Sequence, residues 1–410
     1  MPKERALQPS TLVFALGTFA AGTDAFIIAA FLPKMAQDLG ASEAATGQSV
    51  TAFSIAYALL CPVLATLTAR VPRRTLLISG LAVLMAGNVL AAFSPNLTFL
   101  MVARVLAAAG AAAYTPSSFA VAAGLVRPEY RGRALSVVIG GLTIATAVGV
   151  PLGALMSRSF GWRTALIMVA VLCAIACAGV RVVMPRMPGA EPVPLRRRLA
   201  PLRRWDALQV LTLTILGMGG SYTVYSYAAT ALEPTGVGSE WIGLMMFLYG
   251  AGAVLGNFAS GTGTDRYGPR AILTAGYTVQ VVALGLLGVL AVLRPSAGPA
   301  TLVGAGTLVL LWGGATWTQT PPQNNRLIQR FGPADAPLVV SLNSSAIYAG
   351  IALGSGIGGV VLNARPGAAV YGAATVIEVL ALLLLLLTAS SFHTAKQHPA
   401  ETPAEPSVKK

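Results

Sequence analysis

Charged residues are scarce in this chain. They make up 10% of its 410 residues, whereas 55% of the residues are hydrophobic and the mean hydropathy is +0.71. Soluble globular proteins carry about 25% charged residues. The apolar residues fall in blocks of roughly 20, the length that a helix needs to cross about 30 Å of hydrocarbon. The composition therefore excludes an ordinary soluble domain and predicts an all-α polytopic membrane protein.

Histidine and cysteine are also rare. Both histidines, His393 and His398, lie near the C-terminal end, so no histidine relay or metal site is expected at membrane depth. The three cysteines, Cys61, Cys173 and Cys177, lie in apolar segments and predict neither a disulfide framework nor a metal site. The sequence lacks a Gly-x-x-x-x-Gly-Lys-Ser/Thr phosphate loop. These absences argue against an enzyme, a cofactor and ATP as the energy source.

Twelve apolar segments are long enough to span a bilayer. The first is longer than the core of a signal peptide and runs into Pro33 without a cleavage site, so we expect it to remain in the protein. The expected spans are residues 11–33, 46–69, 75–94, 97–122, 132–157, 162–183, 207–231, 240–263, 271–293, 299–320, 336–361 and 366–391.

A stretch rich in Pro and Arg separates six spans from six and predicts two domains. The expected divisions are an N-terminal six-helix domain at 1–183, a cytoplasmic linker at 184–206, a C-terminal six-helix domain at 207–391 and a disordered cytoplasmic tail at 392–410.

The net charge of +14 has a distribution that does not suit nucleic-acid binding. With the N-terminus inside, most Lys and Arg fall in cytoplasmic segments, as the positive-inside rule requires. This asymmetry predicts a multi-pass protein of the cytoplasmic membrane with both termini in the cytoplasm. Of the 28 basic residues, the exceptions are Lys34, Arg158, Arg163, Arg294 and Arg365 outside and Arg104 within a span.

The two halves resemble each other. ATLTARVPRR at 65–74 aligns with GTGTDRYGPR at 261–270, and LSVVIGGLTIATAVGVPLG at 135–153 aligns with VSLNSSAIYAGIALGSGIG at 340–358. Parallel repeats about an axis normal to the membrane are typical of secondary transporters, whose site lies between the halves near the midplane. We therefore expect two pseudo-symmetric six-helix domains around a central cavity.

Several motifs resemble those of the major facilitator superfamily. The spacing Gly-x-x-x-Asp-Arg-x-Gly-x-Arg at 261–270 is similar to its signature loop, and ARVLAAAG at 103–110 is similar to its fourth-span Arg motif. GGLTIATAVGVPLG at 140–153 resembles its antiporter motif. GTDAFIIAAFLPKMAQDLGAS at 22–42 resembles the first span of the drug:proton antiporter branch, which includes arabinose-efflux-permease-like proteins.

Asp24 is the principal candidate for proton coupling. A carboxylate at membrane depth is expensive unless it faces a bundle interior or a watery cavity. Asp24 lies about 13 Å below Pro33 and Arg104 about 12 Å below Asn96, so the two are at similar depth. The resemblance implies that their spans both line the central cavity. We expect Asp24 to titrate and Arg104 to adjust the pKa or the position of Asp24. The alternative is a fixed ion pair that only joins two helices.

The resemblance also implies which residues line the substrate cavity, from spans one, four, seven and ten. An aromatic cavity with few charges suits amphipathic or weakly cationic molecules. Ordinary packing or an interfacial aromatic belt is the alternative. The expected lining is Phe26, Phe31, Tyr114, Ser221, Tyr222, Tyr225, Ser226, Trp312, Trp317 and Gln319.

Two further groups are expected to move during transport. The expected gating loops hold Arg70 and Arg73, then Asp265, Arg266, Gly268 and Arg270. The first loop has Ala65, Ala69 and Pro72 where the family has Gly, Asp and Gly, so gating is better supported for the second loop. A helix hinge is expected at Gly149, Pro151 and Gly153, with close packing as the alternative.

Two more polar residues lie within spans. Glu378 is read as a structural carboxyl that faces neighbouring helices, with a second proton site as the alternative. Asn343 either caps a helix or lines the inner mouth of the cavity.

The function that these patterns favour is proton-coupled efflux of small organic molecules or drugs by alternating access. Its expected partners are a small-molecule substrate, protons and membrane lipids, and the protein is expected to be a monomer. The alternative is an exporter of sugars, nucleosides or amino acids. A remote alternative is a membrane sensor or scaffold that transports nothing, which would call for a larger soluble domain.

Overall fold

The computed structural model describes residues 9–127, 130–332, 335–365 and 367–388. Within these ranges the chain is helical, and twelve segments are long and apolar enough to cross a membrane. This confirms the predicted fold class and the number of spans. The predicted tail at 392–410 lies outside the described residues.

The N-terminal half supplies six spans, two of which are interrupted. The first span changes from α-helix to a 3-10 turn, and the fifth contains a π-helical segment. The elements are α1 (Pro9–Phe26), η1 (Ile27–Ala30), α2 (Leu32–Asp38), α3 (Glu43–Leu67), α4 (Arg73–Ala92), α5 (Leu97–Gly124), α6 (Arg131–Ile144), the π-segment η3 (Ala145–Gly149), α7 (Val150–Phe160) and α8 (Trp162–Val183).

The C-terminal half follows a short linker and supplies the other six spans. Its tenth span consists of two consecutive helices. The elements are α9 (Leu195–Arg198), η4 (Ala200–Arg203), α10 (Trp205–Tyr225), α11 (Ala228–Leu232), η5 (Glu233–Thr235), η6 (Ser239–Trp241), α12 (Ile242–Tyr267), α13 (Pro269–Leu293), α14 (Pro299–Thr318), α15 (Thr320–Phe331), α16 (Ala336–Ala364) and α17 (Ala369–Leu387).

Local chemistry defines several helix ends. The side chains of Ser42 and Asn96 accept hydrogen bonds from Ala45 N at 3.1 Å and Phe99 N at 2.9 Å, which caps α3 and α5. Gly161 and Gly268 have φ of +91° and +81° at the junctions α7–α8 and α12–α13. A side chain would strain the backbone at both junctions, so glycine permits consecutive spans to reverse within one residue.

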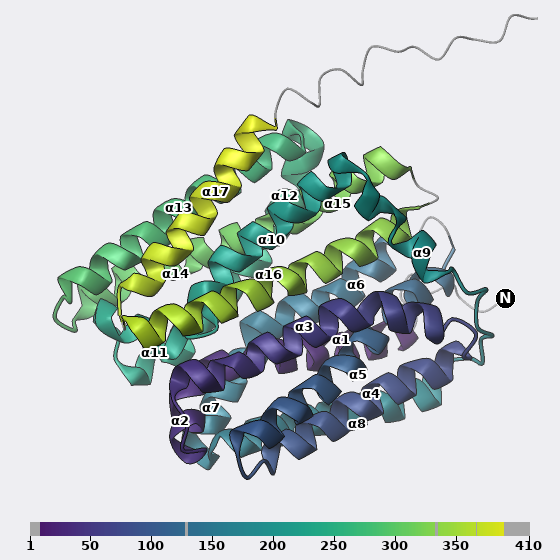
Figure 1. The fold of residues 1–410 in the computed structure, drawn as a ribbon. Coiled ribbons are helices and arrows are strands. Elements are labelled where there is room, and N and C mark those ends of the chain that lie inside the picture. The colour runs from purple at the N-terminus through teal and green to yellow at the C-terminus, as the bar shows by residue number, and fades with distance from the viewer. Residues whose placement is uncertain (1–8, 128–129, 333–334, 366, 389–410) are drawn as a thin grey trace, which may run out of the picture.

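The two halves form separate groups of helices that meet along a shared face. Figure 1 shows α1 to α8 on one side and α10 to α17 on the other, with α3 and α16 side by side at the junction. A second contact joins α12 to η3 and α7. The outer surface of each half is apolar: Val182 on α8 and Leu387 on α17 are 81% and 78% exposed. Such surfaces are stable only against lipid.

The structure corrects three of the expected span boundaries. The first span is α-helical only to Phe26 and ends at Ala30, and the helix of the seventh ends at Tyr225 rather than at 231. The tenth continues through α15 to Phe331 instead of ending at 320. Hydropathy missed α15 because its sequence, TPPQNNRLIQRF, is polar. Tertiary contacts bury its Gln323 and Arg326, whose side chains hydrogen bond to each other at 3.0 Å.

Candidate functional site

The structure brings Asp24 of α1 and Arg104 of α5 into direct contact. Arg104 Nη1 lies 2.5 Å from Asp24 Oδ1, and both side chains are fully buried. Arg104 Nη2 also donates to the backbone oxygen of Asp24 at 3.1 Å. That carbonyl is available because α1 ends at Phe26, and the last four carbonyls of an α-helix have no intrahelical partner. One arginine therefore holds both the side chain and the backbone of Asp24.

Neighbouring helices complete the surroundings of this pair. The Arg104 guanidinium carbon lies 4.3 Å from the centre of the Phe53 ring of α3, a cation–π contact. Asn88 of α4 approaches the carboxylate, although its amide donates to the carbonyl of Leu84 at 3.0 Å. Four helices of the N-terminal half thus converge on one ion pair.

The pair is not fully satisfied. Among the described residues, no group donates a full hydrogen bond to Asp24 Oδ2, and none accepts from Arg104 Nε. Buried polar atoms without partners are uncommon and call for an explanation. An open carboxylate oxygen is a place where a proton can bind while Arg104 still holds the other oxygen.

An aromatic cluster begins two residues after Asp24 and crosses between the halves. Phe26 packs against Tyr222 of α10, Tyr225 of α10 and Trp317 of α14, with ring centres 5.8, 6.3 and 6.0 Å apart. Tyr225 continues the cluster to Tyr249 of α12 at 4.6 Å. All of these rings are buried. The proton-coupling candidate is therefore two residues along the first span from a ring that contacts the opposite half.

Several polar groups of this cluster lack partners. The hydroxyl groups of Tyr222, Tyr225 and Ser226, and Oε1 of Gln319, are buried and form no hydrogen bond within the part of the chain that the structure describes. In contrast, Trp312 Nε1 donates to the hydroxyl of Ser221 at 2.8 Å. Trp312 is therefore fixed, whereas the unpartnered groups are free to bind a polar ligand.

Two predicted cavity residues lie elsewhere. Phe31 lines a cavity of about 800 Å³ between the halves, on the side predicted to be outside, together with Lys34, Glu43 and Glu240. The Tyr114 hydroxyl donates to the carbonyl of Phe14 at 3.1 Å and packs against Gly17 inside the N-terminal half. Its position indicates packing within that half rather than contact with the aromatic cluster.

The sequence reasoning missed the aromatic residues of spans two, eight and eleven. The rings of Tyr57 on α3 and Tyr348 on α16 stack with centres 3.7 Å apart, and Phe53 lies 6.2 Å from Tyr348. Tyr249 on α12 was missed as well. Phe53 and Tyr57 are four residues apart, a spacing that places both on one helix face. That spacing was the available signal, but the resemblance points only to spans one, four, seven and ten.

The predicted hinge residues lie at a break in the fifth span. The π-segment η3 ends at Gly149, and Pro151 follows it within the same span, where its missing N–H removes a bond to the preceding turn. A Cβ on Gly149 would lie 2.0 Å from Thr23 Oγ1, and one on Gly153 would lie 2.2 Å from Ile27 Cδ1. These glycines therefore permit close contact with the first span; a hinge movement stays a prediction.

The predicted gating residues lie at the linker end of the molecule. Arg70, Asp265, Arg266 and Arg270 are exposed, and within the described ranges no ion pair involves them or Arg73. The Arg266 guanidinium carbon lies 5.2 Å from the centre of the Tyr267 ring. Their gating role stays a prediction.

Polar contacts join α3 to α16 toward both ends, and Tyr227 adds a bond to α16 within the C-terminal half. On the side predicted to be outside, Thr51 and Ser355 hydrogen bond at 2.8 Å, and the Tyr227 hydroxyl donates to the carbonyl of Ser355 at 2.9 Å. Burial raises the pKa of Tyr227, so this hydroxyl keeps its proton. At the linker end, Cys61 Sγ lies 3.8 Å from Ser341 Oγ.

Asn343 lies inside the C-terminal half. Its Oδ1 accepts from the hydroxyl of Thr214 at 2.9 Å, and its Nδ2 donates to Asn324 Oδ1 at 2.9 Å. Asn343 therefore joins α16 to α10 and α15. Because α16 begins at Ala336, it is an interior residue of that helix and not its cap.

Two six-helix halves, a buried ion pair within the N-terminal half and an aromatic cluster between the halves are typical of a secondary membrane transporter. The chain belongs to the Major Facilitator Superfamily, whose family model matches residues 14–332 and 210–409. It is therefore a multi-pass membrane transporter of small molecules and not an enzyme.

Known relatives agree with this assignment. The MFS-type transporter YbcL of Bacillus subtilis is 30% identical over 86% of this chain and 88% of its own length. The inner membrane transport protein YdhP of Escherichia coli is 29% identical over 92% of this chain and 95% of its own. The chloramphenicol resistance protein of Streptomyces lividans is 31% identical over 64% of this chain and 69% of its own.

A solved structure shows the same fold. The inward-facing bacterial homologue of the human lysosomal transporter Spinster superimposes with a TM-score of 0.70 at 16% identity. The match covers 93% of this chain and 95% of that one.

Proposed function

We propose that this protein is a proton-coupled exporter of small organic molecules, of the drug:proton antiporter branch, in a bacterial inner membrane. The observation that carries the proposal is the buried Asp24–Arg104 pair, which leaves Oδ2 of Asp24 open two residues before Phe26 joins the aromatic cluster between the halves. The inner-membrane relative YdhP supports the location, and the chloramphenicol resistance protein supports a drug-like substrate.

The mechanism follows from the two oxygens of Asp24. When the halves open outward, a proton binds Oδ2 and removes the carboxylate charge, which weakens the attraction to Arg104. Phe26 is two residues further along the same chain segment, so a shift of Asp24 is transmitted to the rings around Tyr222 and Tyr225. The protonated and unprotonated states then favour different arrangements of the halves, and proton entry drives substrate exit.

The substrate that suits this cluster combines apolar and polar parts. The rings offer large apolar faces, and the hydroxyl groups of Tyr222, Tyr225 and Ser226 offer unpartnered hydrogen-bonding groups. The same groups support the second candidate, an exporter of sugars, nucleosides or amino acids, because such solutes would use more of the hydroxyls.

Proton coupling is tested in everted membrane vesicles whose lumen is acidified, with a pH-sensitive dye. Addition of a transported compound is expected to release protons from the lumen with the wild-type protein but not with Asp24→Asn. Efflux from wild-type cells should fall as the outer pH rises toward the inner pH, because the inward proton gradient disappears, whereas the variant should show no such dependence.

Glu378→Gln is the matched control, since it removes the other membrane-depth carboxyl described in the structure by an equally conservative change. It is expected to retain proton release. Unchanged proton-driven efflux in Asp24→Asn would contradict the proposal. A compound panel separates the candidate substrates: a response to metabolites alone would favour the second candidate, and no response to any compound would favour a sensor or scaffold.

A further inference from the structure

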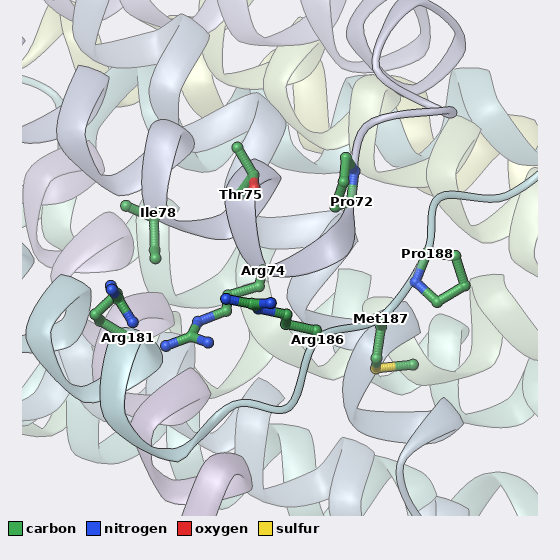
Figure 2. A pocket seen from close by; sticks show the side chains of 8 residues that line it. All are labelled: Pro72, Arg74, Thr75, Ile78, Arg181, Arg186, Met187 and Pro188. Carbon is green, nitrogen blue, oxygen red and sulfur yellow. The ribbon is translucent and has the colours of Figure 1, made fainter.

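A pocket at the linker end of the molecule gathers three arginines away from the transport route. It encloses about 590 Å³ between the start of α4, the end of α8 and the linker. Figure 2 shows the side chains of Arg74, Arg181 and Arg186 assembled between these segments. The lining is completed by Pro72, Thr75, Ile78, Met187 and Pro188.

The linker is fastened to α4 beside this pocket. Arg73 N donates to the carbonyl of Met187 at 3.0 Å, and Ala190 N donates to the carbonyl of Ala69 at 2.8 Å. Gly189 lies so close that a Cβ on it would be 2.3 Å from the carbonyl oxygen of Arg70. These contacts hold the backbone on both sides of Pro188, so Arg186 is presented to the pocket by an ordered segment.

The charges of the pocket are all of one sign. Within the described residues, no ion pair involves Arg74, Arg181 or Arg186, and Nε of Arg74 is buried without a hydrogen-bond partner. The pocket also lies at the N-terminal end of α4, which carries a partial positive charge; the N–H of Arg73 is taken by Met187, but those of Arg74 and Thr75 have no intrahelical partners. Pro72 at the N-cap supplies no side-chain hydrogen bond. Guanidinium groups and a helix N-terminus together match the geometry and charge of a phosphate.

We propose that this pocket binds the phosphate group of an anionic phospholipid of the inner leaflet. The neighbouring surface favours a lipid as the source of the phosphate. Arg181 stands in the last turn of α8 beside Val182, which is 81% exposed, and Ile78 gives the pocket an apolar wall. A headgroup would thus meet the arginines while its chains follow the apolar face of α8. Basic pockets between spans on the cytoplasmic side are suited to such headgroups.

The bound lipid would fasten the linker to the N-terminal half. Arg186 belongs to the linker, whereas Arg74 and Arg181 belong to spans, so one phosphate joins all three. This inference needs neither proton coupling nor a particular substrate, and it stands or falls independently of the proposed function.

Lipid binding is tested on the purified full-length protein by native mass spectrometry, with titration of phosphatidylglycerol against phosphatidylcholine. The double variant Arg74→Gln/Arg186→Gln is expected to bind phosphatidylglycerol about 30-fold more weakly, from about 1 kcal/mol per arginine at the surface. Arg266→Gln/Arg270→Gln is the matched control, because it removes two exposed arginines from the corresponding junction of the other half. It should keep wild-type affinity.

Equal weakening in both double variants, or no preference for phosphatidylglycerol in the wild type, would overturn the proposal. Inorganic phosphate is tested as a competitor. If phosphate at millimolar concentration occupies the wild-type pocket while phosphatidylglycerol does not, the lipid source is wrong and the pocket takes a soluble anion. If the double variant fails to fold, Arg181→Gln is tested in its place, because it changes an exposed side chain. This variant should weaken phosphatidylglycerol binding several-fold. Unchanged binding would count against the site.

Discussion

Asp24 and Glu378 are both fully buried carboxyl groups at membrane depth, but their partners differ. Asp24 contacts the guanidinium of Arg104, whereas Glu378 of α17 accepts a hydrogen bond from the amide of Gln280 at 2.6 Å. Each has one oxygen without a partner among the described residues. A charge on Asp24 has a counterion, but a charge on Glu378 would have none in that part of the chain. Burying an unpaired charge is costly, so the two carboxyls are equipped for different roles.

Their positions differ as well. Asp24 lies beside the interface of the halves, two residues from Phe26. Glu378 lies within the C-terminal half, where it packs so closely on α10 that a Cβ on Gly220 would be 2.2 Å from its Oε1. A network does lead from it toward the centre, since Gln319 Nε2 donates to Gln280 Oε1 at 3.1 Å. The two carboxyls thus share their depth but differ in partner and in position, and it is on those two differences that the proposed coupling role of Asp24 rests.

The largest expected effect comes from removing the counterion of Asp24. Arg104→Gln should destabilise the protein by about 3–5 kcal/mol, because it leaves a buried carboxylate unpaired. The measurement is thermal unfolding of the purified protein in detergent. The double variant Asp24→Asn/Arg104→Gln should recover much of this stability but not proton-driven transport. If the single variant is as stable as the wild type, the pair is not what holds α1 to α5.

A smaller effect is expected at Glu378. Glu378→Leu should cost about 1–3 kcal/mol, because the Gln280 amide loses its acceptor in a buried site. Glu378→Gln keeps an acceptor of similar shape and should stay within about 1 kcal/mol of the wild type. The same unfolding assay measures both. Loss of proton release in Glu378→Gln, with unfolding unchanged, would erase the distinction between the two carboxyls.

The smallest effects are expected at the tyrosine hydroxyl groups of the aromatic cluster that contacts Phe26. Tyr222→Phe and Tyr225→Phe remove unpartnered groups, so stability should change by less than about 0.5 kcal/mol. If a transported compound hydrogen bonds there, its apparent KM should rise roughly 2- to 13-fold, from about 0.5–1.5 kcal/mol per bond. Transport assays over a range of substrate concentrations measure this. An unchanged KM for every transported compound would move the substrate site away from the cluster.

The sequence predicted the depth of most candidate site residues, but it did not show which of them face the other half. Asp24 and Arg104 were expected at similar depth, since rise per residue is regular in a helix. Tyr222, Tyr225 and Trp317 were expected at the centre and lie together there. Tyr114 was grouped with them because depth along a helix says nothing about which side of the helix faces the other half. Helix rotation depends on packing partners that lie far away in the sequence.

Buried polar residues of the C-terminal half are the second feature that the sequence did not predict. Gln280 and Gln323 are fully buried in the C-terminal half, and α15 continues a span that hydropathy ended too early. Polar side chains lower the apparent hydropathy whether or not they find partners. Only the fold shows that Gln280 donates to Glu378 and to the carbonyl of Gly217.

By itself, the sequence determined the class of the protein, the number and order of its spans and the depth of its rare charges. Those properties depend on apolar runs and on the constant rise of a helix, which are local. Only the tertiary structure decided which rare groups meet. Asp24 and Arg104 are 80 residues apart, and the pocket of Arg74, Arg181 and Arg186 joins two spans to the linker. Such contacts arise when helices pack, because close packing selects one relative rotation for each helix.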